Sequence, residues 1–310
     1  MDADKCTEFD RLPETQLKNG IWWLASFPKS GSTWVRMFLN AAVTRFPVDI
    51  NAAFQYISGD LTVGAYQTCT PLPFSMMGVR EAIYLRPASL LAQLTTQPNR
   101  DICLKTHHAN VHVDNIPMCP PKLSKGAVYI VRDPRDVAVS FAKHMGVDIN
   151  KAIDLMGNAQ MCIHRNGSPL YHYISTWSNH VRSWLSQDNP IPISCIRYED
   201  MLTSPQETFQ KIVDGLGLTK HVDQEALEFG LEQSRFDKLK NQEQQSGFRE
   251  TGTKQKTFFN AGQAGGWRDK LTTDQVRRIE REHRDVMEEL GYFDPTRNET
   301  QEPELLQASN

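Results

Sequence analysis

Short apolar runs alternate along this chain with longer segments in which apolar positions recur every three or four residues. The continuous runs lie at residues 21 to 26, 101 to 105, 127 to 131 and 191 to 197, and each has the length of a buried strand. The longer segments carry the spacing of amphipathic helices. Strands that alternate with helices in this way predict an α/β fold, in which a mostly parallel central sheet is flanked by helices.

Three of the predicted helices have clear boundaries. They lie between Gly31 and Pro47, between Tyr171 and Leu185, and between a capping box at Thr272 and Gln275 and a terminal Gly291. Trp177 and Trp184 fall on the apolar face of the second helix, which indicates packing rather than contact with a ligand.

No linker-like stretch or internal repeat divides the chain. We therefore expect one domain over residues 20–293, preceded by an N-terminal extension at 1–19. Residues 294–310 contain little that can be buried, and we expect them to form a disordered tail.

A basic turn follows the first apolar run and precedes the first predicted helix. Its sequence from residue 27 to residue 34 is FPKSGSTW. Unpaired amides at a helix start attract anions, Gly31 permits a close approach of the backbone, and Lys29 adds a positive charge. The turn therefore predicts a P-loop-like phosphate cradle. Its spacing is shorter than that of the nucleoside-triphosphatase loop, in which a hydroxyl residue directly after a glycine-lysine pair holds magnesium; here the lysine precedes the glycine and that arrangement is missing.

A second charged motif begins where the apolar run at 127–131 ends. It reads RDPRDVAVS from Arg132 to Ser140, and Pro134 suits the first turn of a helix. Arg132 and Ser140 are placed to hold a second phosphate. The same pattern also fits a solvated cluster of ion pairs, so the motif alone leaves both interpretations open.

Five motifs in the same order resemble those of sulfotransferases that use 3′-phosphoadenosine 5′-phosphosulfate (PAPS). They are FPKSGSTW at 27–34, KTH at 105–107, VRDPRDVAVS at 131–140, RYEDM at 197–201 and GGWR at 265–268. The resemblance extends over about residues 20 to 290. It implies an enzyme that moves a sulfonyl group from PAPS to the hydroxyl or amine of a small-molecule acceptor by in-line displacement, with release of adenosine 3′,5′-bisphosphate (PAP).

The resemblance also implies a set of donor-binding residues. They are Lys29, Ser30, Gly31, Ser32 and Thr33 for the 5′-phosphate, Arg132 and Ser140 for the 3′-phosphate, Trp34 and Tyr198 for the adenine, and the matching positions Ser234, Gly262, Trp267 and Arg268 nearer the C-terminus. Trp34 also fits a packing role, because a tryptophan within a helix is as often part of the core.

Sulfonyl transfer requires a base for the acceptor proton and a positive charge for the leaving phosphate. His107 matches the base of the family motif, and Lys29 matches the group that stabilises the leaving phosphate, with Lys105 as a second cation. His108 is the alternative base, since neighbouring strand residues face opposite ways. We expect no metal, because no cysteine or carboxylate cluster accompanies His107, His108 and His112.

One departure from the family pattern concerns the 3′-phosphate. Asn260 and Ala261 stand where many cytosolic members carry an arginine and a lysine. We expect a cation elsewhere to replace them, and the candidates are Arg249, Lys254, Lys256 and Arg268. The glycines at 262, 265 and 266 are expected to shape a mobile loop that closes over the donor.

The composition narrows the remaining possibilities. A net charge of −3 gives no electrostatic reason to bind nucleic acid or an anionic membrane, and no apolar stretch has the length of a membrane span. With no secretory core near the start, we expect a cytoplasmic protein. Six cysteines without CxxC spacing favour reduced thiols. The oligomeric state stays open.

The acceptor is less well defined by the sequence. The segments 48–100 and 144–170 are rich in aromatic residues and methionines, which suits either an apolar acceptor pocket or ordinary packing. Two alternatives to a sulfotransferase are a kinase-like phosphotransferase and a non-catalytic nucleotide-binding relative. A kinase would need magnesium ligands, and the sequence shows none. The non-catalytic interpretation would be favoured if His107 faced away from the site.

Overall fold

The central strand β1 (Ile21–Ser26) is buried on both of its faces. Ile21, Trp23 and Ala25 pack into one apolar cluster, and Leu24 packs into a second cluster on the opposite face. Because both faces are covered, the strand is apolar at nearly every position. The computed structural model describes residues 18–52, 56–164, 168–251, 257–259 and 262–293.

Five parallel strands form the main sheet, in the order β2-β3-β1-β6-β9. The other four strands are β2 (Ser58–Gly59), β3 (Ile102–Thr106), β6 (Ser124–Val131) and β9 (Ile193–Arg197). This parallel sheet confirms the predicted fold class, and the strand positions agree with the four apolar runs in the sequence.

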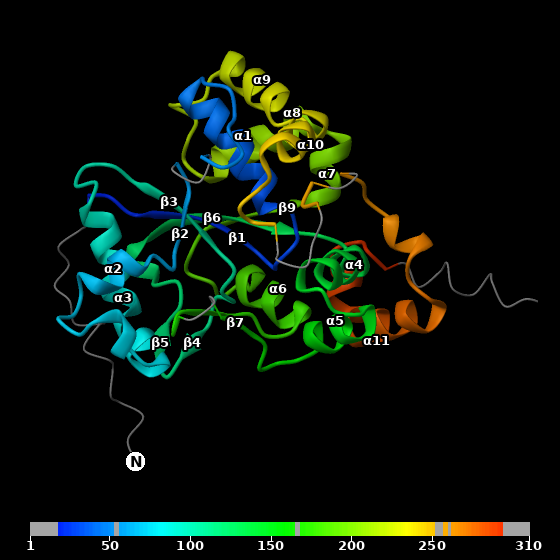
Figure 1. Cartoon of the computed structure of the whole chain (residues 1–310), viewed down its shortest axis with the longest axis horizontal. Helices are drawn as coiled ribbons and strands as arrows, with labels where there is room; N and C mark the ends of the chain where they lie inside the picture. Colours follow the sequence, from blue (N-terminus) through cyan, green and yellow to red (C-terminus); the bar gives the residue numbers. More distant parts are fainter. Residues whose placement is uncertain (1–17, 53–55, 165–167, 252–256, 260–261, 294–310) are drawn as a thin grey trace, which may run out of the picture.

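Helices cover both faces of this sheet (Figure 1). One face is covered by α1 (Ser32–Thr44), α8 (Pro205–Gly215) and α9 (Gln224–Gln233). The other face carries α3 (Val79–Thr95), α4 (Pro134–Met145), α5 (Ile149–Met156), α6 (Trp177–Leu185) and α11 (Thr273–Glu289). No helix in the described ranges is long and apolar enough to cross a membrane.

The remaining elements lie between these strands and helices along the chain. They are α2 (Val63–Gln67), η3 (Phe74–Met76), β4 (His112–Val113), β5 (Ile116–Pro117), η4 (Pro121–Leu123), β7 (Cys162–His164), β8 (Tyr171–Tyr173), α7 (Tyr198–Thr203), α10 (Phe236–Ser246) and η5 (Gly266–Asp269). Strands β4 and β5 form one antiparallel pair, and β7 and β8 form another.

Two of the three predicted helices are confirmed as α1 and α11, and α11 begins with the predicted capping box. The prediction was wrong for the segment that begins at Tyr171. Residues Tyr171–Tyr173 form strand β8, because they pair with β7, and α6 begins only at Trp177 after the N-cap residue Thr176. Trp177 and Trp184 are fully buried in the core, which confirms their packing role.

The strands of the sheet end together at one edge. In the register of the sheet, Ala25 pairs with Thr106, Ser26 with Ile130, and Val131 with Arg197. The segments that follow β1, β3, β6 and β9 therefore leave the sheet side by side. In open α/β sheets this carboxyl edge is where ligands bind. Most of the predicted N-terminal extension (residues 1–17) and the predicted tail at 294–310 lie outside the described residues.

Candidate functional site

The turn between β1 and α1 has a backbone shape that depends on Gly31. This residue has a φ angle of 112°, and a Cβ atom there would lie 2.7 Å from the ring of Tyr198. Lys29 also has a positive φ angle, 71°. A non-glycine residue in this region is uncommon, and such residues concentrate at functional sites.

The turn leaves hydrogen-bonding groups unpaired at the start of α1. No side chain caps the helix at Gly31, and its first turn contains no acidic residue. The Oγ atom of Ser30 is buried and has no hydrogen-bond partner in the described parts of the chain. Unpaired amides at a helix start, with a buried hydroxyl beside them, suit an anion such as phosphate.

Two lysines bring positive charge to this turn, Lys29 within it and Lys105 near the end of β3. Burial lowers the pKa of Lys29 to about 8, with Arg132 and Lys105 adding to the shift and Glu250 opposing it. Burial also lowers the pKa of Lys105 to about 8. The Nζ atom of Lys29 lies 4.0 Å from the ring centroid of Phe258. An anionic ligand would stabilise both ammonium groups in this desolvated setting.

Arg132 connects the second charged motif to the first turn. Its Nη1 atom donates to the backbone oxygen of Lys29 at 3.3 Å, and its Nη2 atom donates to that of Gln263 at 3.1 Å. The guanidinium lies 4.1 Å from the ring centroid of Tyr198, and its Nε atom is buried without a partner in the described segments. The guanidinium is therefore fixed on the cavity wall next to the cradle.

Asp133, Arg135 and Asp136 of this motif have structural roles. The carboxylate of Asp136 accepts hydrogen bonds from the backbone amides of Gly265 at 2.7 Å and Trp267 at 3.0 Å. Asp133 accepts hydrogen bonds from the Arg135 guanidinium at 2.8 to 3.2 Å. These side chains are buried rather than solvated, and Asp136 anchors the backbone that had been predicted to form a mobile closing loop.

A cavity of about 530 Å³ opens along this edge of the sheet. The predicted residues that line it are Lys29, Gly31, Ser32, Thr33, Trp34, Lys105, His107, Arg132, Ser140, Tyr198 and Gly262. Ser30 contributes to the cradle just behind this lining. The cavity wall also contains Val139, Met145 and Ile163, which come partly from the methionine-rich segment.

Three predicted residues lie away from the lining. The hydroxyl of Ser234 donates to the backbone oxygen of Gly230 at 2.8 Å, and the backbone oxygen of Ser234 accepts from the Trp34 indole at 2.9 Å. Arg268 is exposed, and its guanidinium lies over the Trp267 ring at 4.6 Å.

The cations that the sequence suggested for the 3′-phosphate do not line the cavity where they are described, but two other lysines do. Arg249 is exposed and does not line the cavity, whereas Lys143 and Lys270 do. Lys254, Lys256 and the departure at Asn260 and Ala261 lie outside the described residues.

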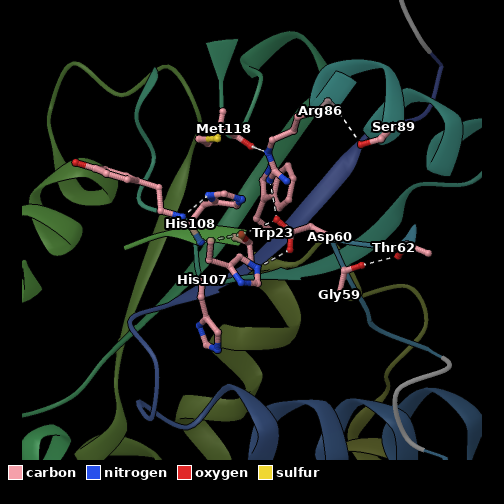
Figure 2. Close-up of polar contacts among 12 residues, drawn as sticks. Trp23, Gly59, Asp60, Thr62, Arg86, Ser89, His107, His108 and Met118 are labelled. Atoms are coloured by element: carbon pink, nitrogen blue, oxygen red, sulfur yellow. Dashed lines mark hydrogen bonds and ion pairs between the residues drawn. The ribbon is translucent and has the colours of Figure 1, made fainter. Parts of the chain in front are cut away.

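His107 and His108 point to opposite sides of the strand end (Figure 2). His107 lines the cavity, while His108 is only 2% exposed and lies in the interior. The Nδ1 atom of His107 lies 2.7 Å from the backbone oxygen of Ser26, which can only accept, so Nδ1 carries the proton and Nε2 keeps its lone pair. Burial lowers the pKa of His107 well below its usual value, and Lys105 adds to the shift. A neutral imidazole with a free lone pair can remove a proton.

The backbone of His107 is also held in place. The Nε2 atom of His180 lies 3.1 Å from the His107 backbone oxygen, and its Nδ1 atom lies 2.8 Å from the Tyr129 hydroxyl. Burial lowers the pKa of His180 to about 3, so this ring is neutral. It donates through Nε2 and accepts through Nδ1, and it thereby fixes the end of β3.

Sequence reasoning missed a buried polar network behind His107 (Figure 2). The carboxylate of Asp60 is fully buried and accepts from the Arg86 guanidinium at 2.6 Å and from the Thr106 hydroxyl at 2.8 Å. It also lies 3.0 Å from Nε2 of His172. Burial alone raises the pKa of Asp60, but Arg86 and His172 bring that pKa well below its usual value. No local motif marks these contacts, because they join distant segments.

Glu250 is a second residue that the sequence did not reveal. Its carboxylate accepts from the Thr33 hydroxyl at 3.0 Å and from the Arg36 guanidinium at 2.9 Å, and it lines the cavity. Thr33 and Glu250 are 217 positions apart in the chain. This carboxylate faces the same region as Lys29, whose pKa it raises.

The chain is similar to known proteins in sequence and in fold. A family model described as "Sulfotransferase domain" matches residues 21–291. Cytosolic sulfotransferase 13 of Arabidopsis thaliana is 26% identical over 255 residues, which cover 80% of this chain and 71% of the relative. Flavonol 4′-sulfotransferase of Flaveria chlorifolia is 23% identical over 270 residues, covering 84% and 76%.

Two solved structures have a similar fold. A mouse sulfotransferase complexed with PAP has a TM-score of 0.57 at 18% identity, with 89% of this chain and 86% of the other covered. Retinol dehydratase in complex with androsterone and PAP has a TM-score of 0.58 at 20% identity, with 89% and 83% covered. Both likenesses support the overall fold.

Proposed function

Because this chain belongs to the sulfotransferase family, we propose that its cavity binds PAPS and a small acceptor, and that a sulfonyl group passes between them. One observation carries the proposal. The turn at the start of α1, the cations Lys29, Lys105 and Arg132, and the neutral imidazole of His107 all line the same cavity at one edge of the sheet. The family match spans most of the chain and supports an enzyme, and the structure supplies the residues that we assign to each step.

We assign the donor's 5′-phosphate to the turn at residues 29–33. Ser30 has a buried hydroxyl without a described partner, and the amides at the start of α1 lack a side-chain cap. These unpaired donors fit a phosphate group. Trp34 and Tyr198 line the neighbouring wall, with ring centroids 6.2 Å apart, and we place the adenine beside them.

We assign the 3′-phosphate to Arg132 and Ser140, with Lys143 and Lys270 in place of the missing arginine and lysine. All four residues line the cavity. Burial lowers the pKa of Lys143, and Lys270 adds to the shift, as expected for two ammonium groups on the same wall. This assignment replaces Arg268 and Arg249 as candidates, since neither lines the cavity.

His107 acts as the general base in this mechanism. Its Nε2 lone pair takes the proton of the acceptor hydroxyl or amine as that group forms a bond to sulfur. The bond between sulfur and the 5′-phosphate oxygen breaks, and its electron pair stays on that oxygen. Lys29 stabilises the negative charge that develops there, and Lys105 provides a second cation beside His107.

The names of relatives support two further assignments. We propose that the acceptor is a small molecule, as in the flavonol sulfotransferase, and that the protein works in the cytosol, as the cytosolic relatives do. Fluorescence microscopy of a tagged full-length chain tests the location, and signal confined to a membrane compartment would contradict it. We also propose that residues 20–293 suffice for donor binding.

Calorimetric titration with PAP tests the donor assignment, with ATP and magnesium as the comparison. We expect micromolar binding of PAP and much weaker binding of ATP, because the turn does not have the spacing of a nucleoside-triphosphatase loop. A parallel assay measures PAP formed from PAPS over an acceptor panel. Tight ATP binding without PAP binding would reject the proposal.

A further inference from the structure

His172 is a second imidazole beside His107 in the cavity. It lies in β8, lines the same cavity as His107, and its side chain is 16% exposed. Its ring stands edge-on to that of His107, with the centroids 5.7 Å apart and an angle of 72° between the planes. The five family motifs do not include this position, and His172 has no role in the mechanism proposed above.

Asp60 determines which nitrogen of His172 carries the proton. The carboxylate of Asp60 is kept ionised by Arg86, so it can only accept hydrogen bonds. Nε2 of His172, 3.0 Å away, must therefore donate to it. Burial lowers the pKa of His172, so the ring is neutral and its Nδ1 atom keeps a lone pair. Within the described segments, this Nδ1 atom has no hydrogen-bond partner.

The two imidazoles are held in opposite ways and present the same chemistry. His107 donates through Nδ1 to the backbone oxygen of Ser26 and keeps a lone pair on Nε2. His172 donates through Nε2 to Asp60 and keeps a lone pair on Nδ1. Both rings line the cavity. When a bound ligand excludes water from these two acceptors, each of them needs a donor from the ligand, because an unpaired polar group in a desolvated site is costly.

A metal site is the alternative explanation of this cluster. Asp60, His108 and His172 place three ligand-type atoms within 4.8 Å of one another. However, Nδ1 of His108 accepts the backbone amide of Tyr173 at 3.1 Å, so its Nε2 atom carries the proton and offers no lone pair. Asp60 is already bound by Arg86 and Thr106. The cluster is therefore arranged as a hydrogen-bond network and not as a ligand set.

We infer that His172 is an acceptor-binding residue, and that the acceptor presents two adjacent hydrogen-bond donors at its reactive end. This inference rests on the proposed function. His107 takes the proton of the nucleophile, and His172 accepts a hydrogen bond from the second donor. A pair of neighbouring hydroxyls or a primary amine supplies both donors, whereas an isolated hydroxyl supplies only one and leaves His172 unpaired.

The experiment uses matched acceptors with PAPS as the donor. Catechol is compared with phenol, cis-cyclohexane-1,2-diol with cyclohexanol, and benzylamine with benzyl alcohol. The first two pairs test neighbouring hydroxyls as the two donors, and the third pair tests a primary amine. PAP formation gives kcat/KM, and mass spectrometry identifies the product. We expect the full-length protein to favour a two-donor member over its one-donor partner by about tenfold or more, because the latter leaves a buried group unpaired.

Variants of His172 show whether this residue produces the preference. His172→Ala should reduce the preference to within about threefold, and His172→Asn, which keeps an acceptor near the Nδ1 position, should recover part of it. The affinity for PAP should change less than about twofold in both variants. His164→Ala is the matched control, because His164 is an exposed histidine in the neighbouring strand β7.

Nitrogen-15 spectra of histidine-labelled protein provide a readout that needs no acceptor. They should show Nδ1 of His172 unprotonated at neutral pH, with the assignment made from His172→Asn. The inference would be overturned by a protonated Nδ1 or by equal use of both members of every acceptor pair. A preference that survives in His172→Ala would also overturn it, as would protein that binds PAP but turns over none of the acceptors. Loss of PAP binding by the unmodified protein would instead reject the proposed function.

Discussion

The cavity has two ends that are built in different ways. We call the end with Lys29 and Arg132 the phosphate end, and the end with His107 and His172 the imidazole end. The phosphate end consists of segments that follow directly from strand ends, such as the turn at residues 27–31 after β1 and Arg132 after β6. The imidazole end depends on contacts between distant segments. Asp60 lies 46 positions from Thr106 and 112 from His172 along the chain, and all three side chains meet in the interior.

This difference indicates how each end can vary. We assign the donor phosphates, which are common to the family, to the phosphate end, where backbone amides at the sheet edge contribute hydrogen-bond donors. We assign the acceptor to the imidazole end, whose shape depends on side chains supplied by connecting segments. A change in those segments can alter the acceptor without disturbing donor binding, and the following experiments separate the two ends.

The largest expected effect is on turnover in His107→Ala. Loss of a general base should lower kcat by about 10²- to 10⁴-fold, while the affinity for PAP changes little. Steady-state kinetics and calorimetry of the same preparation measure both. His112→Ala is the matched control, because His112 is exposed in the short strand β4. Normal turnover in His107→Ala would remove His107 from the role of base.

The next effect concerns stability at the imidazole end. Asp60→Asn leaves the buried Arg86 without its charged partner, which should destabilise the fold by about 3–5 kcal/mol. Urea unfolding followed by circular dichroism measures this loss. Because the pKa of Asp60 is lowered in the fold, its contribution is present above the usual carboxyl pKa and is lost as the pH falls through the lowered value.

The surface pair of Arg182 and Asp285, 3.4 Å apart, provides the control for that measurement. Asp285→Asn should leave the unfolding midpoint almost unchanged, since exposed pairs contribute little. Equal stability of the two variants would show that the Asp60 network is not important for the fold.

A smaller effect is expected for donor affinity as a function of pH. The pKa values of Lys29 and Lys105 are about 8 in the free protein, so both ammonium groups lose their protons as the pH rises through that value. The affinity for PAP should therefore fall by about tenfold between pH 7 and pH 9 for each lysine that must be charged. Calorimetry across this range tests it, and Lys29→Ala should reduce the slope. An affinity that does not change with pH would contradict the assignment.

The smallest effect tests the cations of the 3′-phosphate. Lys143→Ala and Lys270→Ala should each weaken PAP binding about threefold and leave the binding of adenosine 5′-monophosphate unchanged, because that ligand lacks the 3′-phosphate. Arg268→Ala serves as the control, since its exposed side chain does not line the cavity. Equal losses of affinity for the two ligands, or a larger loss in Arg268→Ala, would show that other residues bind the 3′-phosphate.

The sequence allowed much of the phosphate end to be predicted, because each motif there is local. Strand, turn and helix follow one another in the printed order, and Lys29 to Trp34 could be placed from that order alone. Glu250 could not be predicted, since it reaches Thr33 from 217 positions away. The opposite directions of His107 and His108 followed from strand geometry, but only the structure showed that His107 lines the cavity and that His108 lies in the interior.

The error at Tyr171 has a similar physical cause. The segment at Tyr171 carries apolar positions that fit a helix, but its pairing with β7 outweighs that local preference and places His172 beside His107. The contact of Asp136 with the backbone amide of Gly265, 129 positions away, was likewise not apparent in the sequence, and the mobility predicted for this loop stays a prediction. Long-range contacts of this kind are not visible in a single sequence.

The position of Trp34 has a practical consequence for spectroscopy. Of the tryptophans in the described structure, Trp34 lines the cavity, and its indole is fixed by a hydrogen bond to the Ser234 backbone oxygen. An adenine that enters beside it should quench its emission, so the chain contains its own optical reporter of occupancy. With Trp34→Phe as the blank, stopped-flow fluorescence can time the arrival and departure of the nucleotide without any attached dye.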